Sequence, residues 1–454
     1  MLEKMANNAG VYYHSVTLDE EKCKGCTNCI KRCPAEAIRV RNGKARIIDQ
    51  LCIDCGECIR ACPNHAKVAV TDSWDLMNDF KYRIALPAPS LYGQFKNVDV
   101  DNVLTALLEI GFDDVFEVAL GADIVSKLTR QALTENRLRR PVISSSCPAV
   151  VRLVQIRFPS LLDNVLDLCT PMEVAATLAK DEAVRKTGLK REEIGTFFIS
   201  PCGAKVTSVR KPIGTDKTDV DGVLSLASVY SAIADKVKKV QPMPLSKASM
   251  IGIGWAKSGG EAAGTLLENY IYVDGIQNVI KVLEEVELGK MEDLDFLEAM
   301  ACVGGCVGGP LTVENNFVAQ QRIKKLTEKW QKDRNNNKVP AKDEEQGIYN
   351  KMELGRARWK KPLERSDAME LSSDIAEALS MMQRIDEVLA TLPGLDCGSC
   401  GAPTCRTLAE DIVKGLATEY DCVFILKNRI KSLAQELSTL AGKIPPVMGE
   451  GKES

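Results

Sequence analysis

Seventeen cysteines are the residues of this 454-residue chain whose type and spacing most clearly predict chemistry. The chain has only two histidines, so its composition does not fit a histidine-rich zinc or copper site. In a reducing compartment, so many cysteines indicate metal ligation or catalysis rather than disulfide bonds. Sulfur-only ligation favours iron–sulfur clusters or zinc, and sixteen of the cysteines fall into four sets of four.

The first eight cysteines form two copies of the pattern C-x2-C-x2-C-x3-C-P, offset by 29 positions (52 minus 23). In this pattern the fourth cysteine of each copy ligates the cluster of the other copy. The predicted ligands of one [4Fe–4S] cluster are Cys23, Cys26, Cys29 and Cys62, and those of the other are Cys52, Cys55, Cys58 and Cys33. A pair of zinc knuckles is the alternative. The pattern resembles bacterial two-cluster ferredoxins across residues 16–72 and predicts an electron-transfer unit.

Four more cysteines stand singly or in a loose pair, each just after a predicted strand. They are Cys147, Cys202, Cys302 and Cys306. In open α/β sheets, ligands collect at the carboxyl ends of the strands, so these thiols could converge on one cluster. The spacing alone leaves unrelated buried thiols as the alternative.

The last set has the spacing C-x2-C-x4-C-x16-C and consists of Cys397, Cys400, Cys405 and Cys422. Gly398 and Gly401 allow the backbone to approach a cluster closely. Cys405 begins a predicted helix over 406–415, and a helix N-terminus favours the thiolate. The set resembles the small four-cysteine [4Fe–4S] domain of redox and corrinoid enzymes across residues 385–425. A structural zinc site is the alternative.

The elements that must position these cysteines divide the chain into five parts. Residues 1–75 are predicted to form an α+β ferredoxin-like domain, 76–330 an α/β domain, 331–384 a linker and helix, 385–425 a small, mainly helical four-cysteine domain, and 426–454 an amphipathic helix with a disordered tail. The α/β prediction rests on apolar strands that alternate with helical segments. These strands are expected at Tyr82–Leu86, Val142–Ser144, Phe197–Ser200, Met250–Gly254 and Tyr270–Val273.

Three motifs of the α/β domain resemble the signature motifs of the [FeFe]-hydrogenase catalytic domain. They are SSSCP at 144–148, PCGAK at 201–205 and EAMACVGGCVGG at 298–309, and the resemblance also includes APS at 88–90 and GGEA at 259–262. It implies an H-cluster, in which a [4Fe–4S] cubane shares one cysteine with a di-iron subsite. That subsite carries CO and CN⁻ ligands and an azadithiolate bridge.

The resemblance also implies roles for individual residues. The cubane would be held by Cys147, Cys202, Cys302 and Cys306, and Cys306 would be the bridging thiolate. Lys205 would donate to one cyanide, Ser90 with the backbone of Ala88 and Pro89 would contact the other, and Met300 would pack beside the dithiolate. A solvated lysine and an ordinary core methionine are the alternatives for Lys205 and Met300.

The chain departs from the family pattern along its proton route. Ser146 stands where the family has a proton-carrying cysteine, and a hydroxyl is a far weaker acid than a thiol with a pKa of ~8.5. The paired glutamates expected near 124–132 are missing from that segment. Such departures are typical of diverged, sensory members of the family. We hypothesise that Cys169 replaces the lost thiol, with Glu173 or Glu298 as its partner, and a small buried residue is the alternative.

These observations predict an [FeFe]-hydrogenase that interconverts H₂ with protons and electrons slowly, in a sensory or regulatory role. Three accessory [4Fe–4S] clusters would relay its electrons. A catabolic, ferredoxin-linked hydrogenase with a rebuilt proton path is one alternative. A non-catalytic iron–sulfur protein, related to electron-transfer or assembly proteins, is the other.

Composition and patterning restrict the partners. The chain has 59 basic and 62 acidic residues, which gives no electrostatic reason to expect nucleic acid. No apolar run approaches the ~18–20 residues of a membrane helix, and the first residues have no signal-peptide core, so we expect a cytoplasmic protein. The expected partners are a ferredoxin or signalling protein and the hydrogenase maturation factors. Apolar residues spaced 4, 3, 4 and 3 after Leu426 predict either a homodimer or partner helix, or a helix docked on its own domain.

Overall fold

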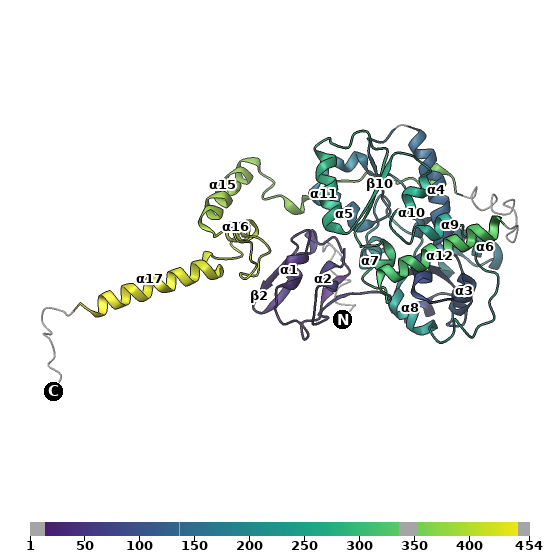
Figure 1. The fold of residues 1–454 in the computed structure, drawn as a ribbon, viewed down its shortest axis with the longest axis horizontal. Coiled ribbons are helices and arrows are strands. Elements are labelled where there is room, and N and C mark those ends of the chain that lie inside the picture. Colours follow the sequence, from purple (N-terminus) through teal and green to yellow (C-terminus); the bar gives the residue numbers. More distant parts are fainter. Residues whose placement is uncertain (1–13, 136, 336–351, 444–454) are drawn as a thin grey trace.

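The computed structural model describes residues 14–135, 137–335 and 352–443 (Figure 1). The predicted tail beyond 443 and part of the predicted linker, 336–351, lie outside these residues. Within them, no helix combines the length and the apolar character that a membrane span requires.

The N-terminal domain has the predicted ferredoxin-like mixture of short strands and helices. Its elements are β1 (Val16–Leu18), α1 (Asn28–Arg32), β2 (Ile38–Arg41), β3 (Lys44–Ile47), α2 (Glu57–Arg60) and β4 (Lys67–Ala69). β1 pairs with β4 and β2 pairs with β3, both antiparallel. Each cysteine-rich copy therefore contributes one short helix, and the two sheets hold the copies together.

The α/β domain contains two parallel sheets. One has the strand order β6-β5-β8-β9, and the other has the order β10-β11-β7. The strands of the two sheets are β5 (Tyr82–Pro87), β6 (Asp114–Val115), β7 (Val142–Ile143), β8 (Ile194–Ser200), β9 (Gly222–Ser225), β10 (Tyr270–Asp274) and β11 (Phe296–Met300). β8 and β11 are buried along their whole length, as expected for parallel strands covered on both faces.

Helices cover both sheets. They are α3 (Val100–Leu108), α4 (Val118–Thr134), α5 (Pro148–Arg157), α6 (Pro171–Thr187), α7 (Gly203–Arg210), α8 (Leu226–Ile233), α9 (Met250–Gly254), α10 (Gly260–Thr265), α11 (Ile276–Glu287), α12 (Asn316–Asn335) and α14 (Leu354–Ala357). α12 continues past residue 330. The segment that follows residues 336–351 also packs on this domain, because Ala357 O accepts a hydrogen bond from Cys169 N at 2.8 Å.

Four of the five predicted strands are confirmed, but the prediction of a strand at Met250–Gly254 is wrong. This segment is helix α9, and the Ser249 side chain caps it by accepting a hydrogen bond from Ile251 N. A Cβ at Gly252 would lie 2.0 Å from Ala119 O, so the glycine permits close packing on α4. A short apolar run of this kind does not distinguish a buried helix from a buried strand.

The C-terminal module consists of α15 (Ile375–Thr391) and α16 (Cys405–Val413), followed by α17 (Val423–Ala441). Asp374 caps α15 by accepting a hydrogen bond from Glu377 N. The module packs around its own small core and lies beside the N-terminal domain, while α17 extends away from both (Figure 1).

Candidate functional site

The N-terminal cysteines line two cavities, and each cavity takes cysteines from both copies of the motif. One is lined by Cys23, Cys26, Cys29 and Cys62, and the other by Cys33, Cys52, Cys55 and Cys58. Each is therefore surrounded by four thiols, a donor set that fits a [4Fe–4S] cluster. These are the two ligand sets that the spacing predicts.

The C-terminal cysteines surround a third cavity. Its lining includes Cys397, Cys400, Cys405 and Cys422, with Gly398 between the first two. α16 begins at Cys405, and α17 begins directly after Cys422. Four thiols around one small cavity again fit a [4Fe–4S] cluster.

The carboxyl ends of strands from both sheets bring the four remaining cysteines of the predicted sets together. Cys202 follows β8 of one sheet, whereas Cys147 follows β7 and Cys302 follows β11 of the other. Burial raises the pKa of Cys306, and the neighbouring charges of Cys202, Cys147 and Cys302 raise it further. The four thiols therefore lie close enough for their charges to affect one another.

Polar groups beside these thiols fit a bound group with anionic ligands. Lys205, in the first turn of α7, is buried, and its Nζ donates to Ser146 O at 2.7 Å. The hydroxyl of Ser90 is fully buried and has no hydrogen-bond partner among the described residues. A buried hydroxyl of this kind costs free energy unless a ligand pairs with it. Ala88 and Met300 are also buried, so apolar surface completes the surroundings.

A pair of buried glutamates lies behind Ser146. Ser146 Oγ donates to Glu261 Oε2 at 2.5 Å, and Ser144 Oγ donates to the same oxygen at 2.6 Å. Burial raises the pKa of Glu261, and the two serine hydrogen bonds oppose that rise. Burial also raises the pKa of Glu298, and the charge of Glu261 adds to this effect.

These glutamates come from elements that the sequence analysis did not combine. Glu261 lies in α10, and Glu298 lies in β11, where its carboxylate accepts from Gly259 N at 2.9 Å and from Ala262 N at 2.7 Å. The expectation from the sequence was that acidic relay groups were missing near α4. The structure instead provides the acidic pair Glu261 and Glu298. Its signal in the sequence was one glutamate in each of two motifs whose other residues are small or apolar, at 259–262 and 298–309.

Cys169 lies in a separate cavity of about 310 Å³. Its neighbours there include Glu173 and Lys360. Burial raises the pKa of Cys169 to about 12, and the charge of Glu173 raises it further. Glu173 also accepts from Thr170 N at 2.7 Å, because the two residues form the capping box of α6. Cys169 is therefore placed with Glu173, whereas Glu298 pairs with Glu261.

The second N-terminal cysteine set packs directly against the α/β domain. Arg60 Nη2, two residues after Cys58, donates to Gly308 O at 2.5 Å. Burial raises the pKa of Cys302, and the charge and hydrogen bond of Arg60 partly oppose that rise. A Cβ at Gly56 would lie 2.6 Å from Pro310 Cγ, so the glycine permits this close approach. Arg60 thus connects the loop around one cysteine set to the loop around another.

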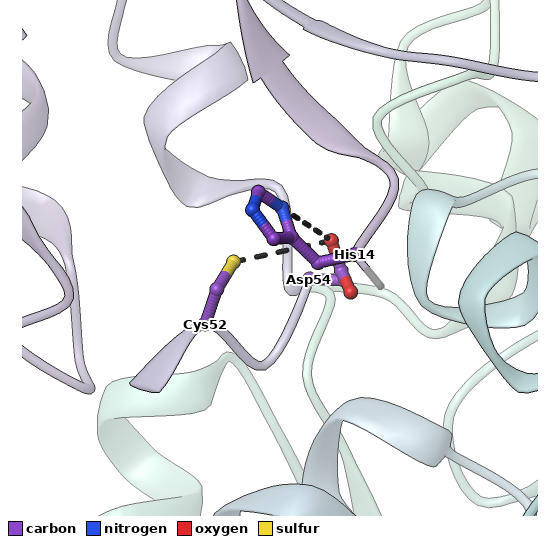
Figure 2. Close-up of side chains that lie close together, drawn as sticks. All are labelled: His14, Cys52 and Asp54. Atoms are coloured by element: carbon purple, nitrogen blue, oxygen red, sulfur yellow. Dashed lines mark hydrogen bonds and ion pairs between the residues drawn. The ribbon is translucent and has the colours of Figure 1, made fainter. Parts of the chain in front are cut away.

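Asp54, drawn with His14 and Cys52 in Figure 2, makes a second connection between these two domains through α7. Its carboxylate accepts from Val16 N at 2.9 Å and from Thr207 Oγ1, in α7, at 2.7 Å. His14, Cys52 and Asp54 have their ligand atoms within 4.8 Å of one another, as a small metal site would require. Because Cys52 also lines a four-cysteine cavity and Asp54 is already hydrogen-bonded, we assign this group a structural role.

Comparison with known proteins identifies the family. A family model described as the iron only hydrogenase large subunit, C-terminal domain, matches residues 81–267 and 251–310. This chain belongs to that family. A 4Fe-4S dicluster model matches residues 15–63, and a model for an Fe-S cluster segment matches residues 392–424. Hydrogenase ancestry and iron–sulfur binding are therefore established for the chain.

Relatives within the hydrogenase family fall into two groups. Iron hydrogenase 1 of Clostridium pasteurianum is 27% identical over 369 residues, which cover 65% of this chain and 64% of that protein. The periplasmic [Fe] hydrogenase large subunit of Nitratidesulfovibrio vulgaris is 24% identical and is covered over 86% of its length. The cytosolic Fe-S cluster assembly factor NAR1 of Scheffersomyces stipitis is 23% identical over 38% of each chain.

A solved structure extends the comparison. An apo variant of the [FeFe]-hydrogenase HydA1 from Chlamydomonas reinhardtii has a TM-score of 0.47 at 14% identity, covering 64% of this chain and 96% of that one. This chain spans less than two thirds of the length of the Clostridium relative.

Proposed function

We propose that this protein is an [FeFe]-hydrogenase that interconverts H₂ with protons and electrons. The observation that carries the proposal is the convergence of four half-buried thiols between two sheets, beside Lys205 and the unpaired hydroxyl of Ser90. Four cysteine thiols alone would fit an ordinary [4Fe–4S] cluster as well as an H-cluster. A buried cation and a buried hydroxyl without a partner additionally fit a cofactor that carries anionic ligands.

The group that fits is an H-cluster, whose iron atoms bind and cleave H₂ when the cofactor is loaded. Its cubane would be held by Cys147, Cys202, Cys302 and Cys306, with Cys306 shared with the di-iron subsite. Lys205 and Ser90 would bind the cyanide ligands, and Ala88, Pro89 and Met300 would keep water from the site. The carbonyl, cyanide and azadithiolate ligands would require dedicated maturation factors.

The chain's own residues provide a proton route that differs from a thiol relay. Ser146 hydrogen-bonds Glu261, and the adjacent Glu298 has a raised pKa. Because two buried carboxylates that influence each other's charge resist carrying two negative charges, the pair retains a proton near neutral pH. We infer that Glu261 and Glu298 hold the proton exchanged with the site, and that Ser146 orients Glu261. A relay through Cys169 and Glu173 is the competing route.

Electrons would pass through the three accessory [4Fe–4S] sites. Arg60 connects the loop of the nearer N-terminal cysteine set to Gly308 of the active-site loop, which favours that set as the electron donor to the site. Turnover would be slow, because Ser146 replaces a stronger acid and positioned acids contribute ~10²–10⁴-fold. Slow turnover suits a sensory or regulatory role in the cytoplasm, with a ferredoxin or signalling protein as the partner, better than bulk H₂ production.

The direct test is H₂ turnover by protein produced with and without hydrogenase maturation factors. The proposal predicts H₂ oxidation and H⁺ reduction with an artificial electron carrier only after maturation. Iron content and visible absorbance provide the control that the accessory clusters are present in both samples. Full cluster loading without turnover after maturation would contradict the proposal. That result would favour the second candidate, a non-catalytic assembly protein, which the similarity to NAR1 supports.

A further inference from the structure

Helix α17 presents an apolar stripe that the described part of the molecule leaves uncovered. None of its residues is buried, and it extends away from the C-terminal module (Figure 1). Only its first turn contacts the module core, through Ile425. The six stripe residues, Val423, Leu426, Ile430, Leu433, Leu437 and Leu440, are 41% to 66% exposed. The alternative that this helix docks on its own domain is therefore wrong.

The stripe has the heptad register of a two-stranded coiled coil. The a positions are Val423, Ile430 and Leu437, and the d positions are Leu426, Leu433 and Leu440. Two of the three a residues are β-branched and all three d residues are leucine, so apolar side chains fill every position of the coiled-coil seam. A second copy of the same helix supplies an identical stripe, so this chain itself is a suitable occupant.

Charges beside the stripe determine the relative orientation of the two helices. Arg429 and Glu436 occupy successive g positions and lie 4.0 Å apart within one helix. In an antiparallel pair, g positions face g positions. When Ile430 packs opposite Leu433 of the partner subunit, Arg429 lies opposite Glu436 of the partner subunit, and this contact occurs twice by symmetry. In a parallel pair, g faces e, and these charges would face alanines.

We propose that α17 forms an antiparallel two-helix coiled coil with a second copy of this chain, with two symmetric Arg429–Glu436 ion pairs that flank its central layers. This inference does not depend on hydrogenase activity. The antiparallel arrangement also places the two bodies, which adjoin the N-terminal end of each helix, at opposite ends of the coil. The two bodies therefore do not clash when the helices pair.

The test is sedimentation velocity of the full, cluster-loaded chain over a range of concentrations. We expect a monomer–dimer equilibrium. Arg429→Glu and Glu436→Arg should each weaken the dimer roughly tenfold, because both symmetric contacts become repulsive. The double variant Arg429→Glu with Glu436→Arg should restore the wild-type dimer constant. Lys431→Glu is the matched control, because it reverses the charge of an exposed residue that is not at a g position. It should leave the dimer dissociation constant unchanged.

Two outcomes would overturn the proposal. A chain that stays monomeric at every concentration would assign the stripe to a different partner. A dimer that Leu433→Glu disrupts, but that neither single reversal at Arg429 or Glu436 weakens, would rule out the antiparallel orientation.

Discussion

At the scale of single residues, the feature that most affects chemistry is the pairing of Glu261 with Glu298 behind Ser146. Both carboxylates are almost fully buried, and both have raised pKa values because burial disfavours their charged forms. Backbone donors from Gly259 and Ala262 hold Glu298 in place, and two serines hold Glu261. On the proposed proton route, this acidic pair would hold a proton next to Ser146 and so compensate in part for the weak acidity of a hydroxyl.

Replacing one member of this pair should slow turnover without removing the cofactor. Glu261→Gln keeps the size of the side chain but cannot exchange a proton, so we expect a loss of ~10²-fold or more in H₂ oxidation. Glu298→Gln should have a similar effect. The measurement is dye-linked H₂ oxidation by matured protein, normalised to iron content, with the exposed Glu292→Gln as the control. Unchanged rates in both variants would contradict a proton route through the pair.

Cys169 discriminates between the two proton routes. Its pKa of about 12 makes it a poor acid at neutral pH, and its charged neighbour is Glu173 rather than Glu261 or Glu298. We therefore expect Cys169→Ala to retain turnover within about twofold, in contrast to Glu261→Gln. A strong loss in Cys169→Ala, with little loss in Glu261→Gln, would instead establish the relay through Cys169 and Glu173.

Single residues also show how far prediction from the sequence extends. The grouping of Cys33 with Cys52, Cys55 and Cys58 was predictable, because motif spacing fixes which thiols can reach one cluster. The partnership of Ser146 with Glu261 was not, because 115 positions separate them and it depends on the pairing of β7, which precedes Ser146, with β11 and on the packing of α10 against β11.

At the scale of elements, the docking of the C-terminal module is the contact that the sequence least anticipated. Asp411 of α16 accepts from Arg39 Nε at 2.7 Å and from Arg41 Nη2 at 2.9 Å, both on β2. Val40 N donates to Gly401 O at 2.8 Å, and a Cβ on Gly401 would lie 2.0 Å from Val40 O. The module therefore docks on the ferredoxin-like domain, although more than 350 positions separate their sequences.

Removing the Asp411 charge should release this module. Asp411 is 5% exposed, so Asp411→Asn would leave two arginines without their carboxylate, a change that typically costs ~3–5 kcal/mol at a buried pair. We expect faster hydrogen exchange in β2 and α16 while the four-cysteine site keeps its iron. Arg406→Gln, on the exposed side of α16, is the control. Unchanged exchange in Asp411→Asn would show that the ion pairs do not hold the module.

Elements differ in how well their sequences specify them. The strand at Phe197–Ser200 is correctly predicted because its apolar run contains bulky residues that favour strands. The error at Met250–Gly254 arose because packing against α4, and not local propensity, determines that α9 is helical. Docking surfaces depend on contacts between distant elements, so motif spacing carries no information about them.

At the scale of the whole molecule, the four cysteine sites belong to three units arranged in series, with the ferredoxin-like domain in the middle. The C-terminal module adjoins the ferredoxin-like domain, which in turn packs on the α/β domain (Figure 1). The sequence predicted clusters on both sides of the catalytic domain, but folding brings the two accessory units together. This arrangement favours a single electron path that leads from the C-terminal module to the active site.

A break in that path should separate electron transfer from the chemistry at the active site. Cys58→Ser removes one ligand of the cluster nearer to the active site, so we expect H₂ oxidation coupled to a protein electron carrier to fall at least tenfold. Exchange of D₂ with water protons needs no external electrons and should persist in the same sample. Equal losses of both activities would indicate that the variant damages the active site instead.

The measurement that tests the central claim most directly is infrared spectroscopy of the matured protein, compared with the unmatured protein and with Cys306→Ala. We expect bands from iron-bound CO and CN⁻ in the matured wild-type chain and none in the unmatured protein or in Cys306→Ala. In matured Lys205→Gln the cyanide bands should be present but shifted. A matured protein that carries all of its iron–sulfur clusters but shows no such bands would contradict the claim that these four converging thiols hold an H-cluster.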